Sequence, residues 1–151
     1  MKKKRFFYFL LFIAAVVVFI SCKKSPVTDN TRSFTWTCRD TTYTAGWDSA
    51  FIRSMATTPI IFAGKGQGSF FSNKQLAISI ASFSTGTYSI GSGNEVEYID
   101  NTGNVFFGIS GTVNITTYAN NRISGSFAAD VAGPTGSFPI SGNFTNTPVA
   151  P

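Results

Sequence analysis

The sequence contains no histidine, two cysteines and few charged side chains, which make up 13% of its residues. Without histidine, the chain lacks the side chain whose unperturbed pKa suits proton transfer near neutral pH, and also the most common metal ligand. Nucleophile pairs such as Ser-His and Cys-His are therefore excluded, and two cysteines cannot build a disulfide framework. These absences favour a protein that is not an enzyme and that carries no metal or other cofactor.

Catalysis by carboxylates alone would need two of them in one cleft. Glycosidases hold such pairs about 5 to 9.5 Å apart. Glu95 and Glu97 project from the same face of an expected strand, but Ile99 shares that face, which favours a solvated outer surface. The turn at residues 100–104 offers oxygen ligands but lacks the acidic density of a calcium loop. We expect neither acid–base chemistry nor a metal site at these residues.

A basic and apolar leader opens the sequence. Met1 is followed by three lysines and Arg5, and fifteen apolar residues then run from Phe6 to Ile20. A permanent membrane span needs roughly 17 to 25 such residues, whereas the apolar region of a secretory signal peptide is shorter. We therefore expect residues 1–21 to form a helical signal peptide that is cleaved.

The end of the leader, Phe19-Ile20-Ser21-Cys22, resembles the lipobox of bacterial lipoproteins. The resemblance implies cleavage between Ser21 and Cys22, a diacylglycerol thioether on Cys22, and a fatty acyl group such as palmitate on the new amino terminus. Most lipoboxes have leucine where this chain has Phe19. Two or three acyl chains anchor a protein almost irreversibly, because each buried CH₂ contributes about 0.8 kcal/mol. The alternative is an ordinary secretory signal with an incidental cysteine.

The leader also accounts for most of the net charge of +5. Removing it leaves eight basic and seven acidic side chains, a net charge of +1. Because the remainder has no basic stripe, we expect no nucleic-acid partner. Residues 22–32 comprise the lipidated cysteine and a polar stretch with Pro26 and no apolar period, which predicts a disordered tether. Residues 33–151 have the usual length of one domain.

The pattern after the tether predicts an all-β domain. Serine, threonine, glycine and phenylalanine abound, and apolar residues alternate with polar ones in many short segments. Phe34, Trp36 and Cys38 are expected on the inward face of the first strand, which makes Cys38 an inert core residue. We expect an antiparallel β-sandwich or flattened barrel of about 8–10 strands. A weak apolar spacing from Asp48 to Met55 predicts a short helix.

The last third of the chain predicts a β-meander. Expected strands near residues 113–117, 123–131 and 138–144 are separated by short turns, so neighbours pair antiparallel. The tripeptide Ile-Ser-Gly recurs, beginning at Ile109, Ile123 and Ile140. Each glycine shares a face with its isoleucine, and glycine lets a sheet bend or a bulky neighbour pack across it. We expect the three tripeptides to mark where the meander curves.

Together these features resemble a group of small bacterial lipoproteins that have a single all-β domain of unknown function. The resemblance extends over nearly all of the chain after the leader. It rests on the lipobox at Cys22, on Phe34-Thr35-Trp36-Thr37 and Gly86-Thr87-Tyr88, and on residues 123–127 and 142–146. These are mostly turn and core residues, so the resemblance implies the fold and no active site.

Three functional hypotheses follow. The leading one is a non-enzymatic binding or structural domain, attached through lipid to the outer membrane on its periplasmic or surface face, with an envelope polysaccharide or protein as partner. A sharper one is glycan binding, in which Tyr43 and Trp47 offer flat faces to sugar rings. The third is a barrel that carries a small apolar ligand, although the many phenylalanines would equally fill a solid core.

Overall fold

The computed structural model of the chain describes residues 32–53, 58–66 and 74–150, without the side chains of residues 50–53. The chain divides into two units, residues 1–30 and 31–151, and all described residues belong to the second. The predicted signal peptide, Cys22 and nearly all of the predicted tether thus lie outside the described residues. In the described ranges, no helix has the length and hydropathy needed to cross a membrane.

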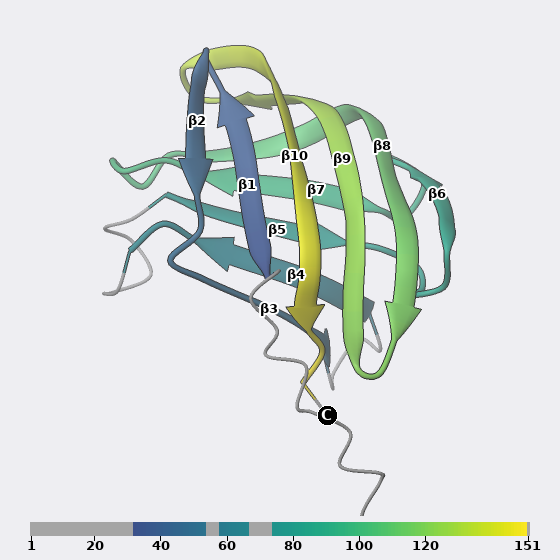
Figure 1. The fold of residues 1–151 in the computed structure, drawn as a ribbon. Helices are drawn as coiled ribbons and strands as arrows, with labels where there is room; N and C mark the ends of the chain where they lie inside the picture. Colours follow the sequence, from purple (N-terminus) through teal and green to yellow (C-terminus); the bar gives the residue numbers. More distant parts are fainter. Residues whose placement is uncertain (1–31, 54–57, 67–73, 151) are drawn as a thin grey trace, which may run out of the picture. The chain divides into compact units, whose positions relative to one another are not determined.

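Ten strands lie within the described residues, and their pairing is antiparallel throughout (Figure 1). They are β1 (Ser33–Cys38), β2 (Thr41–Thr44), β3 (Trp47–Arg53), β4 (Thr58–Gly64), β5 (Gln75–Ser79), β6 (Gly86–Ser89), β7 (Glu95–Ile99), β8 (Val105–Ala119), β9 (Arg122–Gly133) and β10 (Gly136–Pro148). The order in the sheet is β2-β1-β10-β9-β8-β7-β5-β4-β3, and β6 pairs with β8 off this path. The predicted all-β class, number of strands and final meander are confirmed.

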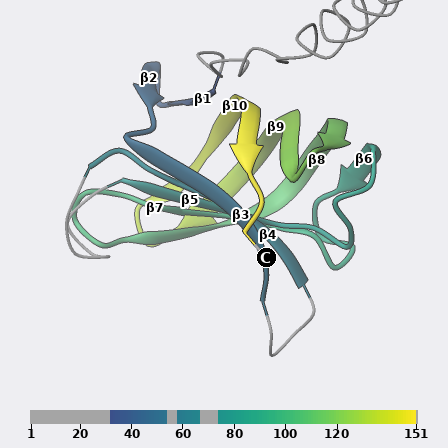
Figure 2. The same cartoon turned by 60° about the horizontal axis from the view of Figure 1, so that its bottom comes forward.

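This single sheet curls into a half-barrel. β10 and β3 are far apart in the strand order yet contact each other, and Figure 1 shows β1, β8, β9 and β10 crossing in front of β3, β4, β5 and β7. Figure 2, with the bottom brought forward, shows β3 and β4 below the arch of β8, β9 and β10. The link between β2 and β3 joins the two arms of the curl, because Ala45 N donates to the Phe34 carbonyl and Gly46 N to the Gly64 carbonyl, each at 2.8 Å. The predicted two-sheet sandwich is not confirmed.

Inward-facing side chains form one apolar core. Phe34, Trp36 and Cys38 are buried in alternation along β1, as predicted. Phe34 stacks on Phe144 with ring centroids 5.6 Å apart, and Trp36 lies at the same centroid distance from Tyr43. Such aromatic pairs contribute about 0.5–1.5 kcal/mol beyond their burial. This ring-filled core favours a solid interior over a ligand-carrying barrel.

The Ile-Ser-Gly glycines lie where strands approach most closely. A Cβ added to Gly111, Gly125 or Gly142 would overlap a backbone oxygen of the neighbouring strand. Gly125 and Gly142 pair directly with Phe144 and Phe127, whose ring atoms would lie 2.7 and 2.6 Å from the added Cβ. A phenylalanine ring can therefore pack over Gly125 and Gly142 because glycine has no side chain, in agreement with the expected packing of a bulky neighbour. The expected curvature at the three tripeptides stays a prediction.

Two register shifts in β8 change which of its residues face inward. The pairing with β9 shifts between Gly108 and Ser110 and again between Ile115 and Thr117. Ile109, at the first shift, is 62% exposed, while the isoleucines of the other two repeats are buried. Thr117, at the second shift, is exposed, although simple alternation along 113–117 put it on the buried face. An unpaired extra residue reverses the alternation, and a local pattern does not reveal it.

The helix predicted from Asp48 to Met55 is wrong. Residues 47–53 form β3, which pairs with β4 in a register that places Asp48 opposite Ala63 and Arg53 opposite Thr58. β4 pairs with β5 on its other side, so β3 completes the hydrogen bonding of a strand whose alternate residues are buried. A weak helical spacing cannot compete with such a ladder, because tertiary context overrides local propensity. Residues 54–57 lie outside the described residues.

Candidate functional site

The two aromatic residues predicted to stack on sugars line separate hollows of the surface. Tyr43 on β2 is half-buried and borders a pocket of about 260 Å³. Trp47, at the start of β3, is also half-buried and borders a hollow of about 350 Å³. The structure therefore does not bring Tyr43 and Trp47 together into one stacking platform.

The surroundings of Trp47 indicate a structural role. Its ring stacks on Phe62, with centroids 5.2 Å apart, and its Nε1 donates to the Gly66 carbonyl at 2.8 Å. Next to it, Arg32 Nε donates to Asp48 Oδ1 at 2.7 Å, and an Arg32 Nη2 contact to the Asp48 carbonyl adds to this pairing. Asp48 is buried, so the ion pair ties the start of β1 to the start of β3. This hollow thus marks the seam between the two arms of the sheet.

The pocket beside Tyr43 is assembled from five parts of the chain and is called the basic–aromatic pocket below. Its lining residues are Cys38, Arg39, Thr41, Tyr43, Lys74, Tyr98, Asp100, Asn101 and Phe106. They come from the β1–β2 hairpin, the residue before β5, the end of β7, the turn between β7 and β8, and the start of β8. The curl of the sheet brings these strand ends to one edge of the half-barrel.

Ammonium groups lie against the Tyr43 ring. Lys74 Nζ is 4.4 Å from the ring centroid and donates to the Tyr43 hydroxyl at 3.1 Å, and Lys65 Nζ is 5.1 Å from the centroid. The ring also packs on Trp36 in the core. A cation over an exposed aromatic face contributes about 0.5–1 kcal/mol. Tyr43 therefore positions two lysines and does not present a free face to a sugar ring.

The Arg39 guanidinium also lines the pocket. The Arg39 guanidinium carbon lies 4.3 Å from the centroid of Phe138 and 5.6 Å from that of Phe106. Arg39 Nη2 also donates to Thr135 Oγ1 at 3.1 Å. Two rings and one hydroxyl thus fix this side chain at the mouth of the pocket.

The positive charge of the pocket is not neutralised by ion pairs. Among the residues that the structure describes, Arg39, Lys65 and Lys74 form none. Asp100 is the one carboxylate in the lining, and its oxygens bond within its own turn: Oδ1 accepts from Thr102 N at 2.8 Å and from Asn104 N at 3.0 Å. Partial desolvation raises the pKa of Asp100, but these hydrogen bonds outweigh it and lower the pKa below its usual value. The lining therefore holds two cations, Arg39 and Lys74, and one carboxylate, and Lys65 lies nearby against the Tyr43 ring.

The inner wall of the pocket offers no general base. Cys38 is 4% exposed, in agreement with its predicted place in the core. Burial raises the pKa of Tyr98 far above its ordinary value, and a hydrogen bond with Cys38 adds to the effect. Tyr98 therefore keeps its proton at neutral pH.

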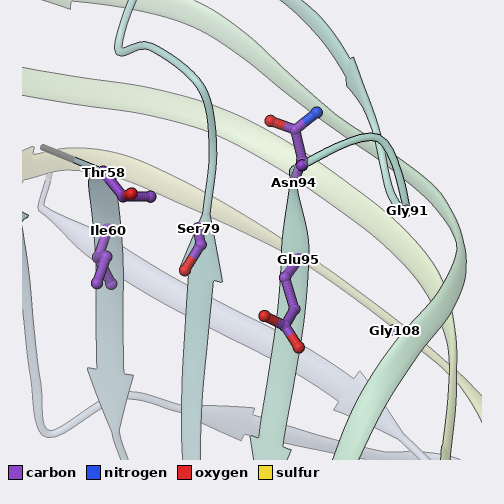
Figure 3. Close-up of a pocket in the computed structure, with 8 residues that line it drawn as sticks. Thr58, Ile60, Ser79, Gly91, Asn94, Glu95 and Gly108 are labelled. Carbon is purple, nitrogen blue, oxygen red and sulfur yellow. The ribbon is translucent and has the colours of Figure 1, made fainter. Parts of the chain in front are cut away.

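A second hollow, of about 460 Å³, lies on the outer face of the sheet (Figure 3). Its lining residues are Thr58, Ile60, Ser79, Gly91, Gly93, Asn94, Glu95 and Gly108. In Figure 3, Glu95 projects along this outer groove while Asn94 points away from it. Asn94 is buried and fixes its loop, because Oδ1 accepts from Ala81 N at 2.8 Å and Nδ2 donates to the Ser89 carbonyl at 3.0 Å.

The two glutamates share the outer face of β7, as predicted. Glu95 is exposed and Glu97 is half-buried. Burial raises the pKa of Glu97, and the neighbouring charge of Glu95 raises it further. In the described part of the chain, no three histidine, cysteine, aspartate or glutamate side chains are close enough together to hold a metal ion. The outer groove contains one carboxylate among its lining residues, without a second for acid–base work.

Sequence reasoning missed Arg39, Lys65 and Lys74. They lie on three segments that are distant along the chain, and each stands alone among polar or glycine neighbours. The sequence offered one signal: only eight basic residues remain after removal of the leader, so each could have been considered as a candidate binding residue. Finding the cluster required the curl of the sheet, which no local pattern encodes.

The comparisons with known proteins add no assignment. Searches with protein-family models, curated proteins and solved structures found no match to this chain. The resemblance to small bacterial lipoproteins therefore stays a prediction from the sequence, and function must be inferred from the leader and the pocket.

Proposed function

We propose that the protein is a lipid-anchored, non-enzymatic binding domain of the bacterial cell envelope. A helical signal peptide over residues 1–21 directs export and is removed, and the acylated Cys22 then holds the protein in a membrane. Residues 22–32 tether the all-β unit, whose site faces the periplasm or the cell surface at the outer membrane. The support for this placement is the leader sequence.

The basic–aromatic pocket supports binding. Arg39 and Lys74 line the pocket, Lys65 lies against the same Tyr43 ring as Lys74, and none of the three forms an ion pair among the described residues. Like charges held together repel, and a ligand of opposite charge relieves that repulsion. This cluster is the observation that carries the proposed function.

The geometry disfavours the other hypotheses. Tyr98 stays protonated and the Asp100 carboxylate bonds within its turn, so the pocket lacks a free base for catalysis. The Tyr43 and Trp47 rings already contact lysines and Phe62, which weakens sugar stacking as the mode of recognition. The apolar interior is occupied by packed aromatic rings, which weakens the carrier hypothesis.

Labelling with a palmitate analogue tests the anchor. We expect the wild-type protein to incorporate the label and to fractionate with the outer membrane, and the variant Cys22→Ser to do neither. Mass spectrometry of the mature protein checks the cleavage site, with acylated Cys22 as its first residue. Finding Cys22 unmodified, or the leader still attached, would contradict the proposal.

Retention on envelope components tests binding. The full chain in detergent is passed over immobilised polysaccharide and protein fractions of the envelope. We expect wild-type protein to be retained on at least one fraction, and the triple variant Arg39→Gln, Lys65→Gln, Lys74→Gln to pass through. Equal retention of both proteins would show that the pocket is not the site.

A further inference from the structure

The cations of the basic–aromatic pocket retain free donors. Arg39 carries five N–H groups, and the structure uses one of its nitrogens for the hydrogen bond to Thr135. Lys74 has three N–H donors and uses one for the Tyr43 hydroxyl. A planar guanidinium fork beside an ammonium group matches the geometry of a carboxylate, sulfate or phosphate group. The donors point to an oxyanion as the occupant.

The backbone at Arg39 gives independent support. Arg39 and Asp40 have φ of 48° and 61°, so the β1–β2 turn places both of its central residues in the left-handed region. Such turns favour asparagine, aspartate and glycine, and arginine at positive φ is uncommon. Unfavourable backbone conformations persist where the surrounding structure enforces them, often at ligand sites. Arg39 thus stands in a backbone conformation that its residue type does not favour, with its side chain directed to the pocket.

The size and remaining lining of the pocket indicate a sugar. Its volume of about 260 Å³ is below the roughly 300–1,000 Å³ of pockets that enclose a drug-sized ligand, so it fits an end group and not a whole cofactor. Thr41 and Asn101 contribute a hydroxyl and an amide, both exposed, which form no side-chain hydrogen bond among the described residues. Neutral donors and acceptors next to a cation pair suit the hydroxyl groups beside an anionic substituent on a sugar ring.

We propose that the basic–aromatic pocket binds the anionic substituent of an acidic polysaccharide. Arg39 and Lys74 hold the carboxylate or sulfate group, Lys65 adds long-range attraction, and Thr41 and Asn101 contact ring hydroxyls. This inference rests on the proposed function and names the ligand class of the same site. Because recognition is by charge, aromatic side chains orient the cations and leave the sugar ring unstacked.

Binding of defined oligosaccharides tests the inference. The full chain in detergent is titrated with fluorescent oligogalacturonate, a sulfated heparin oligosaccharide, and a dextran oligosaccharide of similar length as the neutral probe. We expect an acidic probe to bind and dextran not to bind. The double variant Arg39→Gln, Lys74→Gln should lose at least tenfold in affinity, and Arg39→Lys should lose less, because it keeps the charge without the fork.

A charge-matched control separates the pocket from general electrostatics. Lys24→Gln removes one positive charge from the predicted tether, and we expect it to change the affinity less than twofold. An equal loss for Lys24→Gln and for Lys74→Gln would overturn the inference. Circular dichroism melting of every variant confirms that a loss of affinity is not a loss of fold.

The remaining outcomes distinguish this inference from the proposed function. Equal binding of dextran and the acidic probes would overturn the anionic ligand class, while the protein would remain a binding domain. Retention on envelope fractions without binding of either acidic probe would have the same meaning. Binding to phosphatidylglycerol vesicles that depends on Arg39, without binding of either saccharide, would identify a lipid headgroup and overturn the polysaccharide.

Discussion

Two hairpins of this protein have the same turn geometry but different residues at the turn. Asn120 and Asn121, between β8 and β9, have φ of 52° and 54°, and Arg39 and Asp40, between β1 and β2, have φ of 48° and 61°. Asparagine is enriched in this left-handed region, and arginine is not. The β8–β9 turn therefore has residues that suit its backbone, whereas Arg39 is held against backbone preference. The difference indicates that the β1–β2 turn positions the Arg39 side chain in the pocket, whereas the β8–β9 turn only connects two strands.

The strands that follow the two turns also differ, because β9 is closely packed whereas β2 carries the Tyr43 ring of the pocket. β9 leads to Gly125, over which a phenylalanine ring and a neighbouring strand pack too closely for any side chain. The residues after the β1–β2 turn lead to Tyr43, whose ring faces two lysines with no carboxylate partner among the described residues. The meander end thus depends on close packing, whereas the pocket end holds cations that have no carboxylate partner among the described residues. Substitutions at the two ends should separate stability from binding.

The largest expected effect is at the meander end. Gly125→Val places two methyl groups and a Cβ against the Asn114 carbonyl and the Phe144 ring, so β9 must shift. We expect the free energy of unfolding to fall by about 3 kcal/mol or more, at the upper end of overpacking. Urea unfolding measures it, with Ser126→Ala on the same strand as a control that changes stability by about 0.5 kcal/mol or less. A Gly125→Val protein as stable as the wild type would contradict the packing role of the repeat.

Exchanging the turn residues tests the comparison directly. Asn120→Arg replaces a residue type that suits the left-handed region by one that does not, so we expect a loss of about 1 kcal/mol. Arg39→Asn relieves a similar strain but gives up cation–π contacts of about 0.5–1 kcal/mol, so the net change in stability should be close to zero.

The effects of the same two variants on ligand affinity should be the reverse of their effects on stability. We expect Arg39→Asn to lose affinity for an acidic oligosaccharide and Asn120→Arg to keep it. Thermal unfolding and fluorescence titration of the two variants measure both properties. A large loss of stability in Arg39→Asn with unchanged affinity would show that the first hairpin also serves the fold.

The regular part of the fold could be predicted because its signal is local. Period-two alternation in residues 123–131 and 138–144 identified two long strands, and the recurring glycines identified their close contacts. The pattern failed where pairing decides the outcome. β3 depends on its ladder with β4, and Thr117 is exposed because an extra residue in β8 shifts the register. The alternation of apolar and polar residues within β3 or β8 reveals neither the partner strand nor the register shift.

The candidate site was predicted in part. Tyr43 borders the pocket, but the sequence assigned it to stacking, because the lysines that contact its ring come from other segments. Trp47 lies at the seam between β1 and β3 and belongs to a different hollow. Cys22 and Ser21 lie outside the described residues, and their roles stay predictions. Isolated cations converge into a site when a sheet curls, and the curl depends on long-range pairing.

The smallest predicted effects are those of Glu97 on β7 and Asp100 in the turn after it, whose pKa values shift in opposite directions. Burial and Glu95 raise the pKa of Glu97 above 4.5, so its contribution to stability is complete below that pH and is lost as the pH rises through the folded value. Hydrogen bonds lower the pKa of Asp100 below 3.8 despite partial desolvation, so its contribution is present above that pH and is lost as the pH falls through the folded value.

Glu97→Gln should therefore stabilise the protein at pH 7 relative to its effect at pH 4, and Asp100→Asn should destabilise it at pH 7 by an amount that shrinks toward pH 3. Each change should be about 0.5 kcal/mol or less, because solvent screens both groups. Urea unfolding from pH 3 to pH 7 measures both changes, and parallel pH profiles for the two variants would contradict the opposite pKa shifts of Glu97 and Asp100.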